Sequence, residues 1–226
     1  MILAEAMKDL FFPEHCVHCG AAYGEEGEDA LCRACERALE FHTPPRCVRC
    51  SLPSRAPTCR ACRARSPSYD RLIVLGSYEG VLQSLVKAAK LGNDGAAARR
   101  LIRRAAADAP EGPYDSIIAV PSDHSFAGEL ADSMAVAKSA RRIEFLLRDR
   151  SSIRQGTLNR AERKRNAPKL FSRREAHPGQ SVLLVDDVVT TGATVETCAA
   201  LMRNAGALRV DALAIARTPR VDKSKR

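Results

Sequence analysis

Short apolar runs bounded by polar or turn-forming residues recur through the chain after residue 69. Such runs predict buried strands, and the clearest ones span Leu72–Leu75, Ser116–Val120, Val182–Val185 and Val210–Ala216. A shorter strand is predicted over Ile143–Leu147. Pro121 ends the second of the clear strands, because proline has no N–H to donate to a sheet.

Stretches with helical spacing of apolar residues lie between these strands. Helices are predicted over Val81–Leu91, Ala96–Ala107, Phe126–Ala140 and Ala193–Asn204, and Gly206 is a typical stop for the last of them. Strands that alternate with helices indicate an α/β fold with a parallel sheet. The expected fold class is therefore α/β, preceded by a small N-terminal unit of different character.

That N-terminal unit is defined by cysteine rather than by apolar periodicity. Eight of the nine cysteines fall before residue 63, in four C-x2-C pairs: Cys16/Cys19, Cys32/Cys35, Cys47/Cys50 and Cys59/Cys62. Two such pairs can close a tetrahedral zinc site, so eight thiolates predict two structural zinc ions with no open position for catalysis. Iron–sulfur ligation uses the same residues, but the regular spacing favours zinc.

The pairing of the knuckles has two solutions. Sequential pairing would join the first two C-x2-C pairs in one site and the last two in the other, whereas a cross-braced arrangement would join alternate pairs. We favour the sequential form because each loop is then short. His15, His18 and His42 lie nearby, but the thiolates already complete both sites. Cys198 stands alone in a helical pattern and is expected to be a small buried side chain.

Composition narrows the class of protein. The chain has 226 residues, 45% of them hydrophobic and 28% charged, which is typical of a folded globular protein. It has no apolar run of the roughly 18 residues that a membrane helix needs, and residues 1–13 do not resemble a signal peptide. A cytoplasmic protein without membrane insertion is the expectation.

Charge divides the chain in the same place as the cysteines. The formal net charge is +9, but residues 1–62 carry more acidic than basic side chains, so the surplus belongs to the rest. Arg141–Arg174 alone has 12 basic and 3 acidic residues. This stretch suits a phosphate-bearing partner, either a small ligand or a nucleic acid, or else forms a solvated basic face.

The segment Val182–Thr194, VLLVDDVVTTGAT, carries the clearest chemistry. An apolar strand ends at Asp186 and Asp187, and a loop of small and hydroxylic residues then leads into a helix. Ligands of open α/β sheets bind at the carboxyl ends of strands, and the free amides of a helix N-terminus bind anions. Adjacent carboxylates there can hold sugar hydroxyls or a magnesium ion. The segment predicts a sugar-phosphate site, unless the acids only cap the helix.

This segment resembles the 5-phosphoribosyl-1-pyrophosphate (PRPP) signature of the type I phosphoribosyltransferases. The whole chain resembles the ComF family, which joins a double zinc ribbon to a phosphoribosyltransferase-type domain. The resemblance rests on the four cysteine pairs, the signature and intermediate motifs: Ser77-Tyr78-Glu79-Gly80, Lys87, Lys90, Val120-Pro121 and the run Gln155, Leu158, Arg163, Asn166 and Phe171.

The resemblance implies roles for particular residues. Asp186 and Asp187 would face the ribose hydroxyls and magnesium, and the loop would cradle the 5-phosphate through Thr190, Thr191, Gly192, Ala193 and Thr194. Lys90 and Arg163 would neutralise the pyrophosphate or close over it. Each also has a plainer interpretation, Lys90 as a partner for the helix C-terminus and Arg163 as one member of a basic run.

One departure from the family concerns the loop after Pro121. The family has Arg-Gly-Phe-Asn-Gln there, whereas this chain has Ser122 to Glu129, SDHSFAGE, without arginine. Three functions stay open: a phosphoribosyltransferase that transfers the sugar to a nitrogenous base, a protein of DNA uptake, and a non-catalytic PRPP sensor. As a DNA-uptake protein it would bind single-stranded DNA and a partner such as a helicase.

The expected domain organisation follows from these patterns. Residues 1–66 form the double zinc ribbon, residues 67–219 the phosphoribosyltransferase-like domain and residues 220–226 a basic tail. Ser51–Ser68, which is rich in Pro, Arg and Ser, is interpreted as the linker between the two domains.

Overall fold

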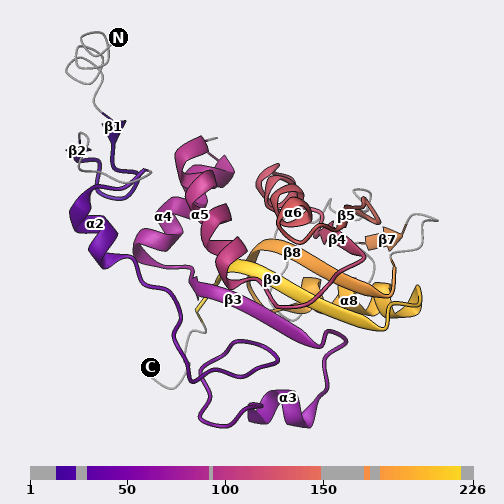
Figure 1. Cartoon of the computed structure of the whole chain (residues 1–226). Helices are drawn as coiled ribbons and strands as arrows, with labels where there is room; N and C mark the ends of the chain where they lie inside the picture. The colour runs from indigo at the N-terminus through magenta and orange to yellow at the C-terminus, as the bar shows by residue number, and fades with distance from the viewer. Residues whose placement is uncertain (1–13, 24–29, 92–93, 149–170, 174–178, 220–226) are drawn as a thin grey trace, which may run out of the picture.

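A parallel five-stranded sheet forms the centre of the molecule (Figure 1). The computed structural model describes residues 14–23, 30–91, 94–148, 171–173 and 179–219. The strands run in the order β3-β9-β8-β4-β5. Their bounds are Arg71–Ser77 for β3, Arg209–Arg217 for β9, Ser181–Val189 for β8, Ser116–Ala119 for β4 and Arg141–Arg142 for β5. The α/β fold class is confirmed.

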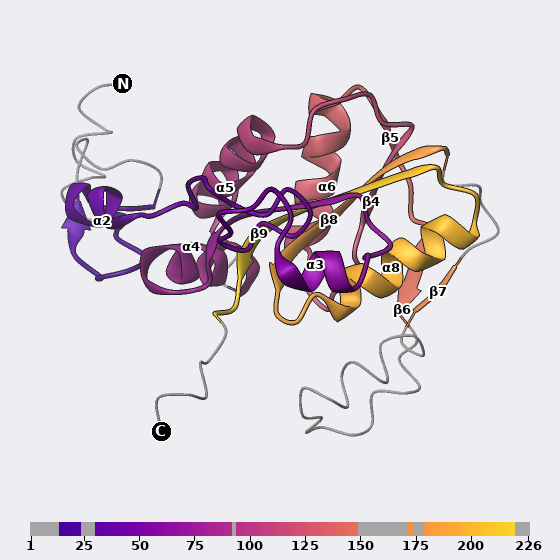
Figure 2. The same ribbon diagram turned by 90° about the horizontal axis from the view of Figure 1, so that it is seen from below.

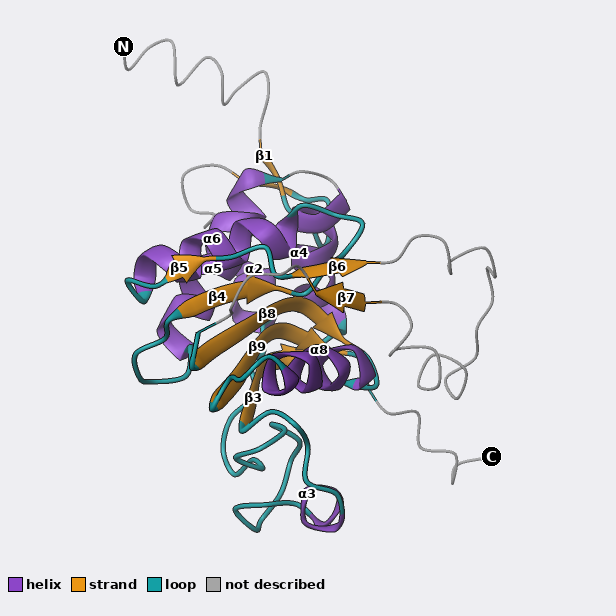
Figure 3. Ribbon diagram, turned by 90° about the vertical axis from the view of Figure 1, so that its right-hand side faces the viewer, coloured by secondary structure: helices purple, strands orange, loops and turns teal. Residues whose placement is uncertain are grey.

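Helices cover both faces of the sheet (Figures 1 and 3). One face packs against α4 (Gly80–Leu91), α5 (Gly95–Asp108) and α6 (Phe126–Ala137). The other packs against α8 (Ala193–Asn204), whose buried face meets apolar side chains of β3, β4, β8 and β9. Alternate residues of β8 and β9 therefore enter opposite apolar cores, so these strands are apolar at nearly every position.

One predicted strand and one predicted helix end at other residues than expected. The strand predicted to end at Val185 continues to Val189, because its pairing with β9 continues to Arg217. The helix predicted to reach Ala140 ends at Ala137, since Ser139 adopts a positive φ of 50° and turns the chain into β5.

The strand predicted over Ile143–Leu147 is observed only at its end. Two-residue β5 lies before it, and β6 (Leu146–Arg148) pairs antiparallel with β7 (Phe171–Arg173) outside the main sheet. Between them Phe145 is fully buried in the core on the α8 side. The chain leaves the sheet to bury this ring, which the apolar run alone did not reveal.

The first cysteine-rich segment packs beside α4 and α5. It contains β1 (Glu14–His15), β2 (Ala22–Tyr23) and α2 (Arg33–Ala38). Glu36 forms an ion pair with Arg100 of α5, and the Arg104 guanidinium lies 4.1 Å from the centre of the Phe41 ring. His18 Nδ1 is 3.0 Å from Ser84 Oγ of α4.

The second cysteine-rich segment, with α3 (Arg60–Ala64), lies beyond the β3 edge of the sheet (Figure 3). The Ser51 hydroxyl donates to the Leu72 carbonyl at 2.7 Å and accepts the Val74 N–H at 3.2 Å. Further bonds to β3 join Leu72 N–H to the Arg49 carbonyl, the Arg46 guanidinium to the Val74 carbonyl, and His42 N–H to the Leu75 carbonyl. The segment thus satisfies an edge strand that would otherwise be open.

None of the helices in the described part of the chain is both long and apolar enough to cross a membrane.

Candidate metal clusters and candidate ligand site

Eight cysteines gather into two clusters of four. In each cluster the four sulfur atoms all lie within 4.8 Å of one another. The first cluster contains Cys16, Cys19, Cys32 and Cys35, and the second contains Cys47, Cys50, Cys59 and Cys62. The sequential arrangement is therefore the observed one, and four thiolates at this spacing fit one zinc ion per cluster.

Backbone turns hold the sulfurs in place. In the first knuckle the Gly20 N–H donates to the Cys16 carbonyl at 2.9 Å, with Gly20 at a positive φ of 73°. In the Cys47/Cys50 knuckle the Ser51 N–H donates to the Cys47 carbonyl at 2.9 Å, and Ser51 also adopts a positive φ, of 56°. Such tight turns bring the two sulfurs of each C-x2-C pair to one side.

The thiol pKa values differ among the members of each cluster. Burial alone would raise the pKa of Cys47, but N–H groups of its own turn and of Cys59 lower it to about 6. The pKa of Cys16 is lowered to about 6 in the same way. Burial and the neighbouring thiols raise the pKa of Cys35 and of Cys62. A divalent cation at the centre would favour all four thiolates, so the donor set fits zinc.

The nearby histidines lie outside both clusters, as expected. His42 Nε2 is 3.2 Å from Ser77 Oγ, and His18 contacts Ser84. Among the described residues the clusters contain only cysteine. Cys198 belongs to α8 and is fully buried between this helix and the sheet, which confirms its expected role as a small core side chain.

Asp186 and Asp187 are buried within β8. Their exposed fractions are 8% and 3%, and the Asp187 N–H donates to Asp186 Oδ1 at 2.9 Å. Burial, followed by the charge of Asp187, raises the pKa of Asp186 to about 7. A cation bound beside the pair would offset both effects.

Lys90, at the end of α4, lies at this acid pair. Its Nζ is 2.7 Å from Asp187 Oδ2, and the Lys90 side chain is 22% exposed. This contact has the distance of an ion pair, yet among the residues that the structure describes Oδ2 has no hydrogen-bond partner of suitable alignment. A buried carboxylate oxygen held by charge alone fits a hydroxyl donor or a metal ion.

The loop after β8 presents hydroxyl and amide groups to solvent. Thr190 and Thr191 are exposed, and Gly192 adopts a positive φ of 81° immediately before α8 begins. The Thr191 hydroxyl accepts the Ala193 N–H at 3.2 Å. Thr194 is half-buried in the first turn of α8. Exposed donors at a helix N-terminus suit a phosphate group.

Some predicted residues lie outside this site. Arg163, with Gln155, Leu158 and Asn166, lies outside the described residues. In the loop after Pro121, the Ser122 hydroxyl donates to the His124 carbonyl and accepts the His124 N–H. These two hydrogen bonds lie within the turn, and its sequence supplies no lysine or arginine.

Glu196 is a residue that sequence analysis missed. Its carboxylate accepts the Ser68 N–H at 3.1 Å and the Ser68 hydroxyl at 2.9 Å, which ties the first turn of α8 to the end of the cysteine-rich segment. An acidic side chain in the first turn of a helix is ordinary, so no local signal distinguishes it.

Comparison with protein families matches residues 7–66 to the double zinc ribbon domain and residues 97–226 to the phosphoribosyl transferase domain. The chain is 27% identical to "Competence protein F" of Haemophilus influenzae, over 92% of this chain and 98% of that protein. It is 28% identical to "DNA utilization protein YhgH" of Escherichia coli K12, over 85% and 92%. Among solved structures, a glutamine PRPP amidotransferase from B. subtilis is 24% identical, with a TM-score of 0.39 over 52% of this chain and 26% of that one.

Proposed function

The chain belongs to the phosphoribosyl transferase domain family, with a double zinc ribbon ahead of that domain as in the ComF family, and we propose that it binds PRPP or a related sugar phosphate with magnesium. The ribose hydroxyls meet Asp186 and Asp187, and the 5-phosphate meets the loop from Thr190 to Thr194. The supporting observation is the buried acid pair beside an exposed hydroxyl and amide loop on one strand–helix connection.

Lys90 acts on the same ligand. Without ligand its ammonium neutralises Asp187, as the 2.7 Å contact indicates. Asp186 and Asp187 would hold a magnesium ion that accompanies PRPP, and this ion would supply positive charge beside the carboxylates. Lys90 would then be available to contact the pyrophosphate oxygens. Lys90 thereby exchanges one anionic partner for another at little electrostatic cost.

We infer binding rather than turnover as the primary activity. Transfer of the ribosyl group requires pyrophosphate to leave, and positive charge at the leaving group supports this step. The segment from Pro121 to Ala137 has no lysine or arginine. A non-catalytic PRPP-binding module fits this loop better than a phosphoribosyltransferase acting on a nitrogenous base, which is the second candidate.

A role in DNA uptake or utilisation is the cellular setting that we propose. It is supported by the names of the relatives, "Competence protein F" and "DNA utilization protein YhgH", and by the basic surplus after residue 62. Single-stranded DNA would then bind with an affinity that falls steeply with salt. Neutralising Arg163, Lys164 and Arg165, which lie outside the described residues, should reduce that salt dependence.

The experiment that tests the ligand is calorimetric titration of the zinc-loaded protein with PRPP, with and without magnesium. We expect magnesium-dependent binding in the native protein. The Asp186→Asn, Asp187→Asn double variant should lose it, because amides do not replace two carboxylates at a magnesium–ribose site. Its circular dichroism spectrum should match that of the native protein, which checks that the variant still folds.

The matched control is Glu111→Gln with Glu144→Gln, which removes two exposed carboxylates from the same domain but outside the segment from Pro121 to Ala137. This control should bind PRPP as the native protein does. Unchanged binding by the Asp186→Asn, Asp187→Asn variant would refute the site, and no binding by the native protein would refute the ligand.

A further inference from the structure

A cavity of about 710 Å³ lies between the second cysteine cluster and α8. One wall comes from the second cysteine-rich segment, including the metal ligands Cys50 and Cys62, and the other from the loop Thr190–Ala193 and one side of α8. Figure 2 shows α3 of that segment beside the start of α8. The two walls come from parts of the chain that are far apart in sequence.

Specific bonds hold the second cluster against the loop. Glu196 binds both the N–H and the hydroxyl of Ser68, six residues after Cys62. From the sheet, the Arg217 guanidinium donates to the Cys50 carbonyl at 2.6 Å. Both Glu196 and Arg217 line the cavity, so its shape depends on the docking of this one cluster.

The cavity shares the loop with the proposed phosphate site but is not lined by the acid pair. Its lining includes Thr190 to Ala193 but does not include Asp186, Asp187 or Lys90. A phosphate held at the loop could therefore carry an organic group into the cavity without passing over the carboxylates. The volume lies within the roughly 300–1,000 Å³ typical of pockets for small organic molecules.

The lining suits an apolar ring with a polar edge. Apolar side chains are contributed by both walls, namely Leu52, Pro67, Tyr69, Ala200 and Leu201. Thr197, Asn204 and Arg65 supply hydroxyl, amide and guanidinium groups among them. We propose that this cavity is a subsite for the organic ring of a phosphate ester whose phosphate is held by the loop Thr190–Ala193, and that the second cysteine cluster, not the first, shapes it.

This proposal rests on the proposed phosphate-binding role of the loop. The first cluster packs at α4 and α5 and contributes none of the residues that line the cavity. Loss of metal from the second cluster would release Cys50 and Cys62, and with them one wall. Loss of metal from the first cluster would leave that wall in place.

The test compares two phosphate esters that differ in the group at the anomeric carbon of the sugar, which is adenine in one and a hydroxyl in the other. Adenosine 5′-monophosphate and ribose 5-phosphate are titrated calorimetrically into the zinc-loaded full chain without magnesium. Burial of the adenine ring in the cavity should make the first bind about tenfold more tightly than the second. The native protein is also titrated with PRPP and magnesium, to measure the proposed function separately.

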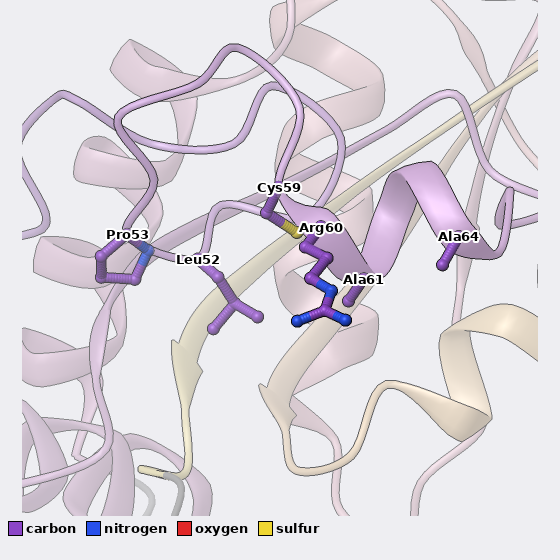
Figure 4. Close-up of a pocket in the computed structure, with 6 residues that line it drawn as sticks. All are labelled: Leu52, Pro53, Cys59, Arg60, Ala61 and Ala64. Carbon is purple, nitrogen blue, oxygen red and sulfur yellow. The ribbon is translucent and has the colours of Figure 1, made fainter.

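Cavity filling identifies where the ring binds. Ala61 of α3 lines the cavity, whereas Ala64 of the same helix lines only a neighbouring surface recess (Figure 4). Both alanines are exposed, so tryptophan is accommodated at either position. Ala61→Trp should abolish the advantage of the nucleotide and Ala64→Trp should retain it, while ribose 5-phosphate binds equally to both.

Whether the subsite depends on metal in the second cluster is tested by comparing Cys62→Ser with Cys19→Ser. Each variant should lose one zinc ion per chain by metal analysis, but only Cys62→Ser should lose the advantage of the nucleotide. Equal affinity of the two esters for the native protein, or an equal effect of the two tryptophan variants, overturns the subsite while PRPP binding stands. If the native protein binds none of the three ligands, the proposed function fails as well.

Discussion

Asp211 is a fully buried carboxylate at the start of β9, and it holds together the end of the sheet opposite the acid pair. Arg71 and Arg209 donate to its Oδ2 at 2.9 and 2.6 Å, and the Tyr114 hydroxyl donates to the same atom at 2.8 Å. Burial alone would raise the pKa of Asp211, but these donors outweigh burial and hold the pKa below its ordinary value. A group of this kind stabilises the fold only while it is ionised.

We expect Asp211→Asn to lower the free energy of unfolding at pH 7 by about 3 kcal/mol, because it leaves two guanidinium groups without their buried partner. The sign of the pH dependence follows from the lowered pKa. The stability that ionised Asp211 contributes is complete above the pKa of the unfolded state, about 3.9. It is lost as the pH falls through the lower pKa of the folded state.

Urea unfolding of both proteins at pH 7 and between pH 5 and pH 3 measures this difference. The gap in stability should narrow below about pH 4. A gap that stays constant to pH 3 would show that the carboxylate charge is not what stabilises this cluster.

At the scale of elements, Ser51 joins the second cysteine-rich segment to β3. Its hydroxyl donates to the Leu72 carbonyl and accepts the Val74 N–H, and Ser51 is 6% exposed. A buried carbonyl and a buried N–H that lose their partner cost more than the bond itself contributes. The edge of the sheet thus depends on one hydroxyl in the turn that also positions Cys47 and Cys50.

Ser51→Ala should therefore destabilise the protein by about 2 kcal/mol, since both backbone groups lose their partner. The control is Ser54→Ala, whose hydroxyl donates only to the Ala56 carbonyl within the same loop. Thermal unfolding of the two variants compares them. Equal losses would indicate that the edge contact contributes little.

The apolar pattern predicted most elements well. The strands β3, β4, β8 and β9 and the helices α4, α5 and α8 lie where the runs and the helical spacing indicated. Asp186 and Asp187, however, lie inside β8 rather than at its end, because the strand continues wherever β9 offers backbone partners. Local patterns mark the start of a strand more reliably than its end.

The contacts that assemble the site could not be predicted from local sequence. The ion pair of Lys90 with Asp187 and the bonds between Glu196 and Ser68 join residues that are far apart in the sequence, 128 positions in the second case. Such contacts depend on the order of strands in the sheet and on where each connection crosses it. By contrast, the four-cysteine clusters could be predicted, because the C-x2-C spacing already brings two ligands together.

At the scale of the molecule, the two clusters stabilise different parts of the structure. The first is attached beside α4 and α5, and the second covers the β3 edge and borders the loop before α8. Ser51–Ser68, interpreted from sequence as a linker, is therefore held by hydrogen bonds to the sheet and to α8. The second cysteine-rich segment is therefore packed against the α/β domain rather than joined to it by a free linker.

We expect two zinc ions per chain by metal analysis, one for each set of four thiolates. Their removal by a chelator should speed amide exchange at Leu72 and Val74, whose N–H groups bond to the second segment, more than at the centre of β8. One ion per chain, or iron in place of zinc, would contradict the two-cluster structure. Equal protection before and after chelation would show that the edge cover does not need metal.

The hydrogen bonds between the second cysteine-rich segment and β3 also have a consequence during synthesis of the chain. The ribosome releases residues 42–51 before β3, whereas β9, the other neighbour of β3, emerges more than a hundred residues later. An apolar strand without neighbours is prone to aggregate during that interval. The second cysteine-rich segment precedes β3 and can bind it at once. We therefore expect this segment to protect β3 from aggregation until β9 has been synthesised.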